Sequence, residues 1–243
     1  MAIAKKYQAF RYKTQGSGKN KYIKIINFDN SSVTPIVPAY INDIPVKAID
    51  DYAFHETTIE SITMPNTLEE IGEYVFAGCH RLKNISFPDS VKNIGDMVCS
   101  ACHSLEFVKW SKAAKRIPSF AFLNCENLRE ITNTDFVKTI DNHAFYESGL
   151  ISFKVPPELI SLGSCSFAEC HDLQLIKMTH LPTIPQSAFA FSKNIRISCG
   201  DIDHIKTWAS VKGIPIVENK LNTFLNDIKV SDKSHDEVIR GDE

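Results

Sequence analysis

The sequence predicts a β-rich α/β solenoid, a right-handed coil of about seven repeats of 22–23 residues, because apolar residues recur at a fixed interval along most of the chain. Three apolar positions recur with the same interval in each repeat. The middle position is a phenylalanine in every repeat but one: Phe54, Phe76, Cys99, Phe122, Phe145, Phe167 and Phe189. An isoleucine or leucine lies five residues before each of these, and another lies five or six residues after it. One such turn cannot bury its own apolar face, so we expect the turns to stack.

Residues 82–104 show how one repeat is expected to fold. Ile85 and Phe87 alternate with polar residues, which is typical of a short strand whose apolar side chains point inward. Pro88 ends this strand because proline has no N–H to continue the ladder. Residues 91–94 then return along the opposite wall as a second short extended segment.

Each repeat also contains a small residue followed by the recurring aromatic residue, as in Ala53-Phe54 and Ala144-Phe145. This pair predicts a tight helical corner with the ring tucked inside. Because the corners of neighbouring repeats lie above one another, the rings should stack as a spine along the axis of the coil.

The full spacing, L-x-x-I-x-F-P-x-x-V-x-x-I-x-x-x-A-F-x-x-C, resembles the BspA-type leucine-rich repeat over residues 46–200. Residues 35–46 are similar to the segment that precedes the first repeat in that family. The resemblance implies a leucine-rich-repeat solenoid that is not catalytic, in a family of interaction and adhesion proteins that often lie at the cell surface. The chain departs from the pattern at Cys99, and the repeats around Thr57 and Ser148 lack the late cysteine.

The chain is expected to divide into four parts: residues 1–45 as an N-terminal β-hairpin cap, 46–200 as the solenoid, 201–218 as a C-terminal cap and 219–243 as a charged tail. A solenoid needs caps because an open end would expose its core and its unpaired strand edge. Residues 7–13 and 21–28 predict the two strands of the hairpin. Gly16 and Gly18 then form its turn, and not a phosphate-binding loop, because Lys13 stands where such a loop needs its first glycine.

At the other end, the repeat pattern is expected to fail at Ser198, where an apolar residue is due. A short helix should follow, ended by Gly213, and residues 214–217 could add a final strand. Four residues share one face of this helix: Ile202, Ile205, Trp208 and Ala209.

The tail is expected to begin with a short amphipathic helix and to continue as disordered chain after Val230. The apolar face of that helix consists of Leu221, Phe224, Leu225 and Ile228. We expect this face to dock on the C-terminal cap, and the alternative is that it binds a partner or a second copy of the chain.

The composition favours a folded protein without a nucleic-acid or membrane role. The 243 residues are 43% hydrophobic and 23% charged, and the formal net charge is −2. That charge does not support bulk electrostatic binding to nucleic acid or to acidic membranes. No stretch approaches the ~20 apolar residues that cross a bilayer. No apolar run follows the first lysines, so we expect a cytoplasmic protein, with a secreted or cell-surface protein as the alternative. We also expect a monomer rather than an oligomer.

The seven cysteines are interpreted as reduced, structural thiols. Cys99-Ser-Ala-Cys102 has the spacing of a redox or zinc motif, but Cys102 shares its repeat position with Cys79, Cys125 and Cys170. Histidines follow three of these cysteines and should point into solvent. We expect no metal and no cofactor, and the alternative is a metal or redox protein built on the Cys-His rows.

Catalysis is not expected, because the sequence contains no nucleophile elbow, zinc-protease helix or Ser-His-Asp pattern. Binding is expected instead, on the parallel-strand face that solenoid curvature usually makes concave. Six steps of ~4.8 Å would give a face about 29 Å long. The outward residues of its strands are the candidate site: Ser61, Thr63, Asn84, Ser86, Phe107, Lys109, Glu130, Thr132, Ser152, Lys154, Leu175 and Lys177.

Phe107 and Leu175 are apolar where this face should be polar, and a lysine follows each of them two positions later. With Lys154, these residues form a candidate hot spot for a moderately acidic protein partner. The alternative is that they are ordinary exposed apolar residues. We therefore expect non-catalytic protein binding, in adhesion or host interaction by resemblance, or else in an intracellular scaffold or regulator that uses the same face.

Overall fold

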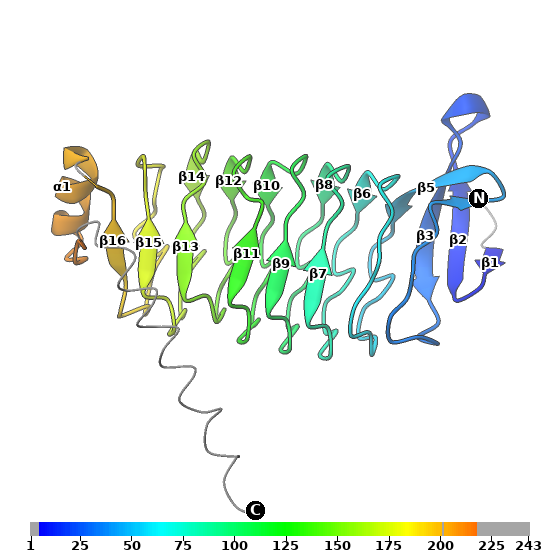
Figure 1. The fold of residues 1–243 in the computed structure, drawn as a ribbon, viewed down its shortest axis with the longest axis horizontal. Helices are drawn as coiled ribbons and strands as arrows, with labels where there is room; N and C mark the ends of the chain where they lie inside the picture. The colour runs from blue at the N-terminus through cyan, green and yellow to red at the C-terminus, as the bar shows by residue number, and fades with distance from the viewer. Residues whose placement is uncertain (1–4, 201, 218–243) are drawn as a thin grey trace, which may run out of the picture.

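The computed structural model describes residues 5–200 and 202–217 (Figure 1). They form one elongated coil of stacked turns, with short strands repeated along its length and a single helix at the C-terminal end (Figure 1). This confirms the predicted solenoid. The predicted tail at 219–243 lies outside the described residues.

One wall of the coil is formed by six short parallel strands whose middle residue points into the core. They are β7 (Asn84–Ser86), β9 (Phe107–Lys109), β11 (Glu130–Thr132), β13 (Ser152–Lys154), β15 (Leu175–Lys177) and β16 (Arg196–Ser198). We call the outer surface of this wall the strand face. It also includes residues 61–63, which continue the wall by one coil toward the N-terminus. In the described residues, its ladder is divided into two three-stranded sheets, β11-β9-β7 and β13-β15-β16.

The expectation of one continuous strand face is therefore wrong at the junction of β11 and β13. Leu150 follows Ser148 by two positions, whereas Leu128 follows Cys125 by three, so this return segment is one residue shorter. We attribute the break to that shortening. Arg129 Nη1 donates to the carbonyl of Gly149 at 2.9 Å, which supplies this carbonyl with a side-chain partner.

The opposite wall is built from two-residue parallel strands. They are β6 (Glu70–Ile71), β8 (Asn93–Ile94), β10 (Arg116–Ile117), β12 (Thr139–Ile140) and β14 (Ser161–Leu162), preceded by the longer β5 (Ile44–Ile49). This ladder breaks between β8 and β10, whereas β7, β9 and β11 pair across the same coils. Because the two walls break at different coils, each break is spanned by the other wall.

The recurring aromatic rings stack along the axis, as predicted. The ring centroids of Phe54 and Phe76 are 5.4 Å apart, and those of Phe145 and Phe167 are 5.0 Å apart. Phe28 stacks on Phe54 at 5.0 Å, so the spine begins one turn before the first repeat that the sequence reveals. Such pairs add to the stability gained from burial alone.

The spine lacks a ring at Cys99, and a tryptophan from another position packs beside this gap. Trp110 is fully buried. Its ring lies 5.9 Å from Phe122, the next ring of the spine, and 5.1 Å from Phe87, in edge-to-face geometry in both cases. The loss of one phenylalanine therefore leaves a core that is still filled with aromatic side chains.

The predicted helical corner is wrong, because the chain turns there through left-handed residues. Tyr52 has φ 59° and Glu56 has φ 54°, and the equivalent positions of other coils repeat this geometry. Alternate backbone N–H groups then point along the axis and join the next coil: Tyr52 N donates to Glu73 O at 3.0 Å and Phe54 N to Val75 O at 3.1 Å. The N–H groups between them close turns within the coil, as His55 N does to Tyr52 O at 3.1 Å, so the corner extends the ladder between coils without forming a helix.

The N-terminal cap has three antiparallel strands and not the two that were predicted. β1 (Lys5–Tyr7) and β2 (Phe10–Gln15) are separated by Gln8, which has φ 51°, and β3 (Tyr22–Phe28) follows a short 3₁₀ helix (Gly18–Asn20). β3 also pairs in parallel with β5, so the cap is the first layer of the coil. β4 (Tyr40–Ile41) pairs antiparallel with β5.

The C-terminal cap is the predicted helix, α1 (Asp203–Val211), with Ile205 and Ala209 buried against the core and Gly213 at φ 66° just after it. The repeat does not fail at Ser198, because β16 still pairs in parallel with β15. The predicted final strand is reduced to a single bridge between Ile197 and Ile216.

In the described part of the chain, no helix has the length and apolar character needed to cross a bilayer.

The late cysteines form a row of buried thiols that donate hydrogen bonds between coils. Cys79 Sγ donates to Phe54 O at 3.1 Å, and Cys170 Sγ donates to Phe145 O at 3.0 Å. Ser192 holds the same position in its own coil and donates to Phe167 O at 2.8 Å. The row therefore supplies a donor to the carbonyl of a spine residue in the preceding coil, and a hydroxyl does this as well as a thiol.

All seven cysteines are free thiols, which agrees with their structural interpretation. Burial raises the pKa of Cys79 to about 12 and that of Cys170 to about 11. It also raises the pKa of Cys99 and Cys125 well above the ordinary thiol value. The histidines that follow the row are exposed: His80 and His103 stack at 5.0 Å on the outside of the coil.

We predict that only Cys165, which is half-buried, is alkylated rapidly by iodoacetamide in the native protein at pH 8. The six buried thiols should react at least a hundredfold more slowly because they are shielded from the reagent. The raised pKa values of Cys79, Cys99, Cys125 and Cys170 add to this effect, since only the thiolate is nucleophilic. Mass spectrometry of labelled peptides measures each rate, with the urea-unfolded protein as the control. Rapid native labelling of Cys79 or Cys125 would contradict this packing.

We also predict that the free energy of unfolding falls as the pH rises above about 9, the ordinary pKa of a thiol. The unfolded thiols then ionise, whereas those of Cys79 and Cys170 stay protonated in the native state until their raised pKa values are reached. Urea unfolding at pH 8 and pH 10.5 measures the change. Cys79→Ser, which keeps a hydrogen-bond donor, should reduce this dependence, and an unchanged dependence would rule out the assignment.

Two buried serines should respond to the same substitution with opposite sign. Ser166 Oγ is fully buried and has no hydrogen-bond partner, whereas Ser192 Oγ accepts from Cys170 N at 2.9 Å and donates to Phe167 O. Ser166→Ala should stabilise the protein by about 1 kcal/mol, and Ser192→Ala should cost about 1–3 kcal/mol by leaving buried backbone groups unpaired. Thermal unfolding measures the change in stability of each variant. If both variants are stabilised, or both are destabilised, the prediction is wrong.

Candidate functional site

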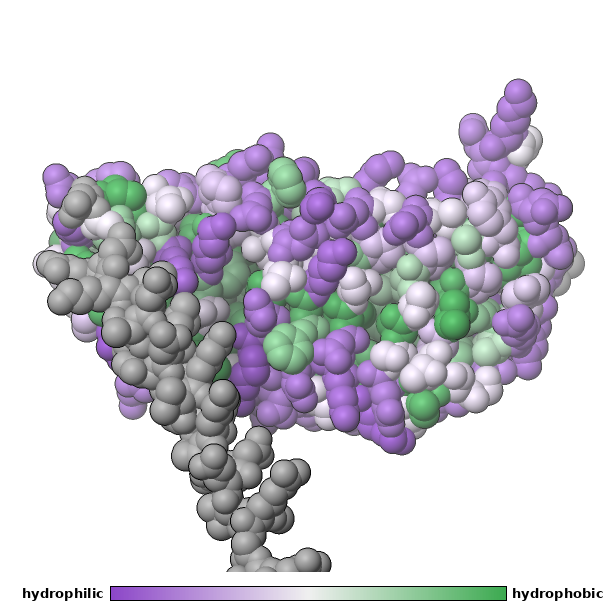
Figure 2. Space-filling model, viewed as in Figure 1, coloured by the Kyte–Doolittle hydropathy of each residue, from purple (hydrophilic) through white to green (hydrophobic). Residues whose placement is uncertain are grey.

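Two adjoining depressions cross the N-terminal half of the strand face. The first encloses about 350 Å³ and the second about 530 Å³, and they share Ile62, Ser86 and Lys109. Eight of the twelve candidate site residues line them: Ser61, Thr63, Asn84, Ser86, Phe107, Lys109, Glu130 and Thr132. In Figure 2, hydrophobic surface gathers in a band across the middle of this face, between rows of hydrophilic side chains.

The alternation of the short strands places these side chains outside. In β7, Asn84 and Ser86 are exposed while Ile85 is buried, and the parallel register aligns the strands without a shift. Asn84 therefore lies beside Phe107, and Ser86 beside Lys109. The outward residues form two rows that run across the coils.

Phe107 lies in the middle strand of the sheet β11-β9-β7, between Asn84 and Glu130. Its side chain is 46% exposed. A ring so placed keeps much of its apolar surface in water, in a depression whose other outward side chains are polar. It is the largest apolar group that the first depression offers to a ligand.

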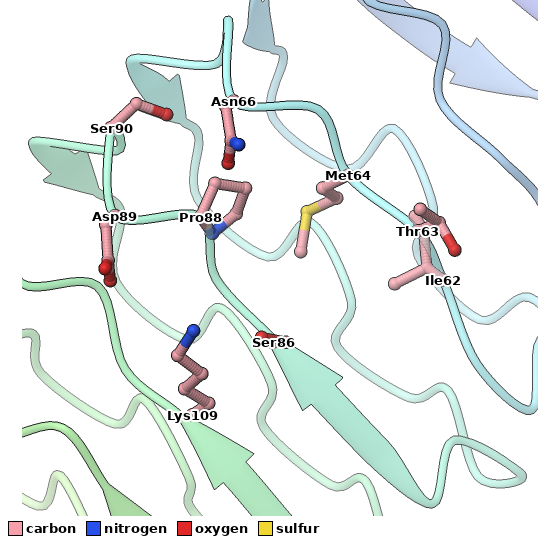
Figure 3. Close-up of a pocket in the computed structure, with 9 residues that line it drawn as sticks. All are labelled: Ile62, Thr63, Met64, Asn66, Ser86, Pro88, Asp89, Ser90 and Lys109. Carbon is pink, nitrogen blue, oxygen red and sulfur yellow. The ribbon is translucent and has the colours of Figure 1, made fainter.

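The second depression lies where β7 and β9 end and the chain turns toward the opposite wall (Figure 3). Met64 and Pro88 provide apolar surface. Lys109 extends from the end of β9 toward the turn that carries Pro88 and Asp89 (Figure 3). Asp89 is already held by other groups, because it pairs with Lys112 Nζ at 3.4 Å and accepts from Asn133 Nδ2 at 3.0 Å.

The strand face also contains an apolar residue that the sequence analysis missed. Ile36 bridges to Thr63 in parallel, so it continues the row of Thr63, Ser86 and Lys109 by one coil. Its side chain is 68% exposed. The alternation of exposed Ile36 with buried Pro35 and Val37 could have revealed it, but the segment precedes the recognisable repeats.

The prediction that Leu175 is an exposed apolar residue is wrong. It has the outward register of β15, yet it is only 3% exposed, and Ser198 in the neighbouring strand β16 is buried too. Alternation within a strand tells which side of the sheet a side chain occupies, but not whether that side is covered near the end of the coil.

The three lysines of the predicted hot spot do not converge. Lys154 pairs with Asp135 at 3.0 Å, and Lys177 is half-buried on the far side of the break in the ladder. Only Lys109 lines the depressions, and it makes no ion pair with any described residue. Ser152, Lys154, Leu175 and Lys177 thus lie apart from the other eight candidate residues.

The groups around the depressions suit binding by shape and hydrogen bonds. They offer hydroxyls, amides, one aromatic ring, one free ammonium group and the carboxylate of Glu130. Among residues 5–200 and 202–217, no group of three or more histidine, cysteine or acidic side chains is arranged to hold a metal ion. The Cys-His rows do not form one either, since the thiols point into the core and donate to carbonyls.

Comparison with solved structures shows the same fold in other leucine-rich-repeat proteins. A leucine rich cell surface protein from Faecalibacterium prausnitzii A2-165 has a similar structure, with a TM-score of 0.57 and 18% identity over 83% of this chain and 71% of that one. A Leucine Rich Repeat protein of T. pallidum gives a TM-score of 0.52 and 24% identity over 70% and 91%. A search of curated proteins gave no significant match.

The family described as "BspA type Leucine rich repeat region (6 copies)" matches residues 47–174 and 97–215, which together cover more than half of the chain. This range includes every coil from β6 to β16. The chain therefore belongs to the BspA-type leucine-rich-repeat family.

Proposed function

We propose that this protein is a non-catalytic binding protein that holds a segment of another protein on its strand face. The observation that carries the proposal is Phe107, a half-exposed aromatic ring in a depression otherwise lined on its outer side by polar groups. Interfaces concentrate their binding energy in such aromatic anchors, and a polar rim around them excludes water.

The geometry suits an extended segment. From Ser61 to Glu130, the depressions cross four coils, a distance of about 14 Å at ~4.8 Å per step. An extended chain rises by about 3.3 Å per residue, so roughly four residues would fit along this path. The segment needs an apolar side chain to cover Phe107.

Lys109 indicates the charge of the partner. Its ammonium group has no ion pair within the described part of the chain, and it borders both depressions. An acidic side chain on the bound segment would satisfy it and would orient the segment on the face. We therefore propose a moderately acidic protein partner bound by a monomer, with no nucleic acid and no insertion into a membrane.

Adhesion or host interaction is the setting that we propose first. The BspA-type resemblance supports it, and the similar protein of F. prausnitzii is described as a cell surface protein. An intracellular scaffold or regulator is the second candidate, because all seven cysteines are free thiols, a state that reducing compartments maintain. Both candidates use the same face.

The proposal predicts that Phe107→Ala weakens the binding of a strand-face ligand by about 2 kcal/mol, or roughly thirtyfold. Ligands would be selected from a phage-displayed peptide library on the intact chain, and their dissociation constants would be measured by titration calorimetry. Lys109→Glu should weaken acidic peptides more than neutral ones, because it reverses the charge beside the anchor.

Phe136→Ala is the matched control. Phe136 is also an exposed phenylalanine, 41% exposed, but it lies off the strand face with Lys115 Nζ 4.7 Å above its ring. Binding should survive this change. If the selected peptides bind Phe107→Ala as tightly as the unaltered chain, or lose as much affinity with Phe136→Ala, the strand face is not the binding site.

A further inference from the structure

The corners carry a second external row of side chains, which we call the corner row: Tyr52, Tyr74, Met97, Phe120, His143 and Cys165. Each lies two residues before a spine position. Each is also left-handed, with φ between 54° and 59°. Glycine or asparagine adopts this conformation at least cost, and a bulky side chain there carries strain of about 1–3 kcal/mol. Aromatic residues at these positions therefore call for an explanation beyond the turn.

Neighbouring rings of the corner row stack on one another outside the core. The centroids of Tyr52 and Tyr74 are 4.7 Å apart with their planes 11° from parallel. Those of Phe120 and His143 are 4.8 Å apart at 10°. The coil spacing that aligns the buried spine thus also builds a partly exposed ladder of rings.

The first ring of this ladder is the most exposed. Tyr52 is 53% exposed, whereas Tyr74 is half-buried beneath it. Tyr74 covers one face of the Tyr52 ring, and His55 touches it edge-on at 5.5 Å. Tyr52 therefore presents an aromatic surface that nothing in the core requires.

Two carboxylates lie on the same corner as this ring. Asp51 and Glu73 each directly precede a tyrosine of the row, and both are exposed. Neither makes an ion pair with a described residue, whereas Asp50 beside them pairs with Lys24 at 2.7 Å. Partial loss of water and the charges of Tyr74, Glu73 and Asp51 raise the pKa of the Tyr52 hydroxyl.

We propose that Tyr52, Asp51 and Glu73 form a second binding surface, which takes an arginine side chain from a basic segment of another protein. A guanidinium group stacks flat on an aromatic ring and donates in-plane hydrogen bonds to carboxylates at the same time. Binding at this surface therefore needs both the aromatic ring and the carboxylates. It lies on the corner of the coil and is independent of the strand face.

The same row provides an internal comparison. Phe120 has the same backbone and also stacks on its neighbour, but the residue before it is Ser119, and the residue before His143 is Asn142. A ring with no carboxylate directly before it or before its stacking neighbour is therefore present three coils away, and the acid of the preceding coil, Asp96, is already paired with Arg116 at 3.0 Å. The two sites differ in charge while their corner geometry is shared.

The test is the binding of a fluorescent synthetic peptide of Arg-Gly-Ser repeats to the intact chain, measured by anisotropy at low salt. Tyr52→Asn removes the ring and keeps a residue that tolerates the left-handed backbone, and it should weaken binding about tenfold. Phe120→Asn is the matched control and should leave binding unchanged. A peptide of Lys-Gly-Ser repeats with equal charge should bind more weakly, because an ammonium group lacks the planar fork.

Asp51→Asn tests the charge separately from the fold. Asp51 Oδ1 accepts from Glu73 N at 2.8 Å, and Asn142 Oδ1 accepts from Ser164 N at the same distance in a later coil, so asparagine preserves this bond. The variant should melt like the unaltered chain and bind the arginine peptide several-fold more weakly. The proposal is overturned if the peptide does not bind, if neither Tyr52→Asn nor Asp51→Asn weakens it, or if Phe120→Asn weakens it equally.

Discussion

The structure depends on one constraint: no coil can bury its own apolar face, so every coil needs its neighbours in register. The aromatic spine satisfies this constraint with rings about 5–6 Å apart, and the backbone satisfies it with hydrogen bonds that run along the axis at both walls and at the corner. The thiol and hydroxyl row adds a third set of links inside the core. The proposed binding function uses this arrangement: stacking buries the inward side chains and leaves whole rows of outward side chains on the surface.

The periodicity of the sequence was sufficient to predict the coil, the spine and the outward register of the strands, since each depends on apolar residues that recur at a fixed interval. What it could not predict depends on non-periodic contacts. Leu175 is covered although its register points outward, and a single missing residue before Leu150 interrupts the ladder of the strand face. The left-handed corners were also hidden, because tyrosine, methionine and histidine are not the residues that usually indicate such turns.

The outward register of the strands indicated which side of the sheet the candidate site residues occupy, but not which of them lie together. Eight of the twelve candidate residues come together around Phe107 and Lys109, while the remaining four lie beyond the break and outside the depressions. The sequence did not reveal Ile36, because it precedes the repeats, or the corner row, because its side chains project from left-handed turns that its residue types do not indicate. Both belong to surfaces that only stacking creates, and the two proposed surfaces differ in the partner they favour: an acidic segment on the strand face and an arginine-bearing one on the corner.

The most direct test of the central claim is site-specific photo-crosslinking of the intact protein in its native cells. A benzoylphenylalanine replaces Ser86 on the strand face in one variant and Asn93 on the opposite wall in another, both exposed positions in two- or three-residue strands. The account predicts a discrete cross-linked protein from position 86 and none from position 93. Capture of the same protein from position 93 alone, or equally from both positions, would contradict it.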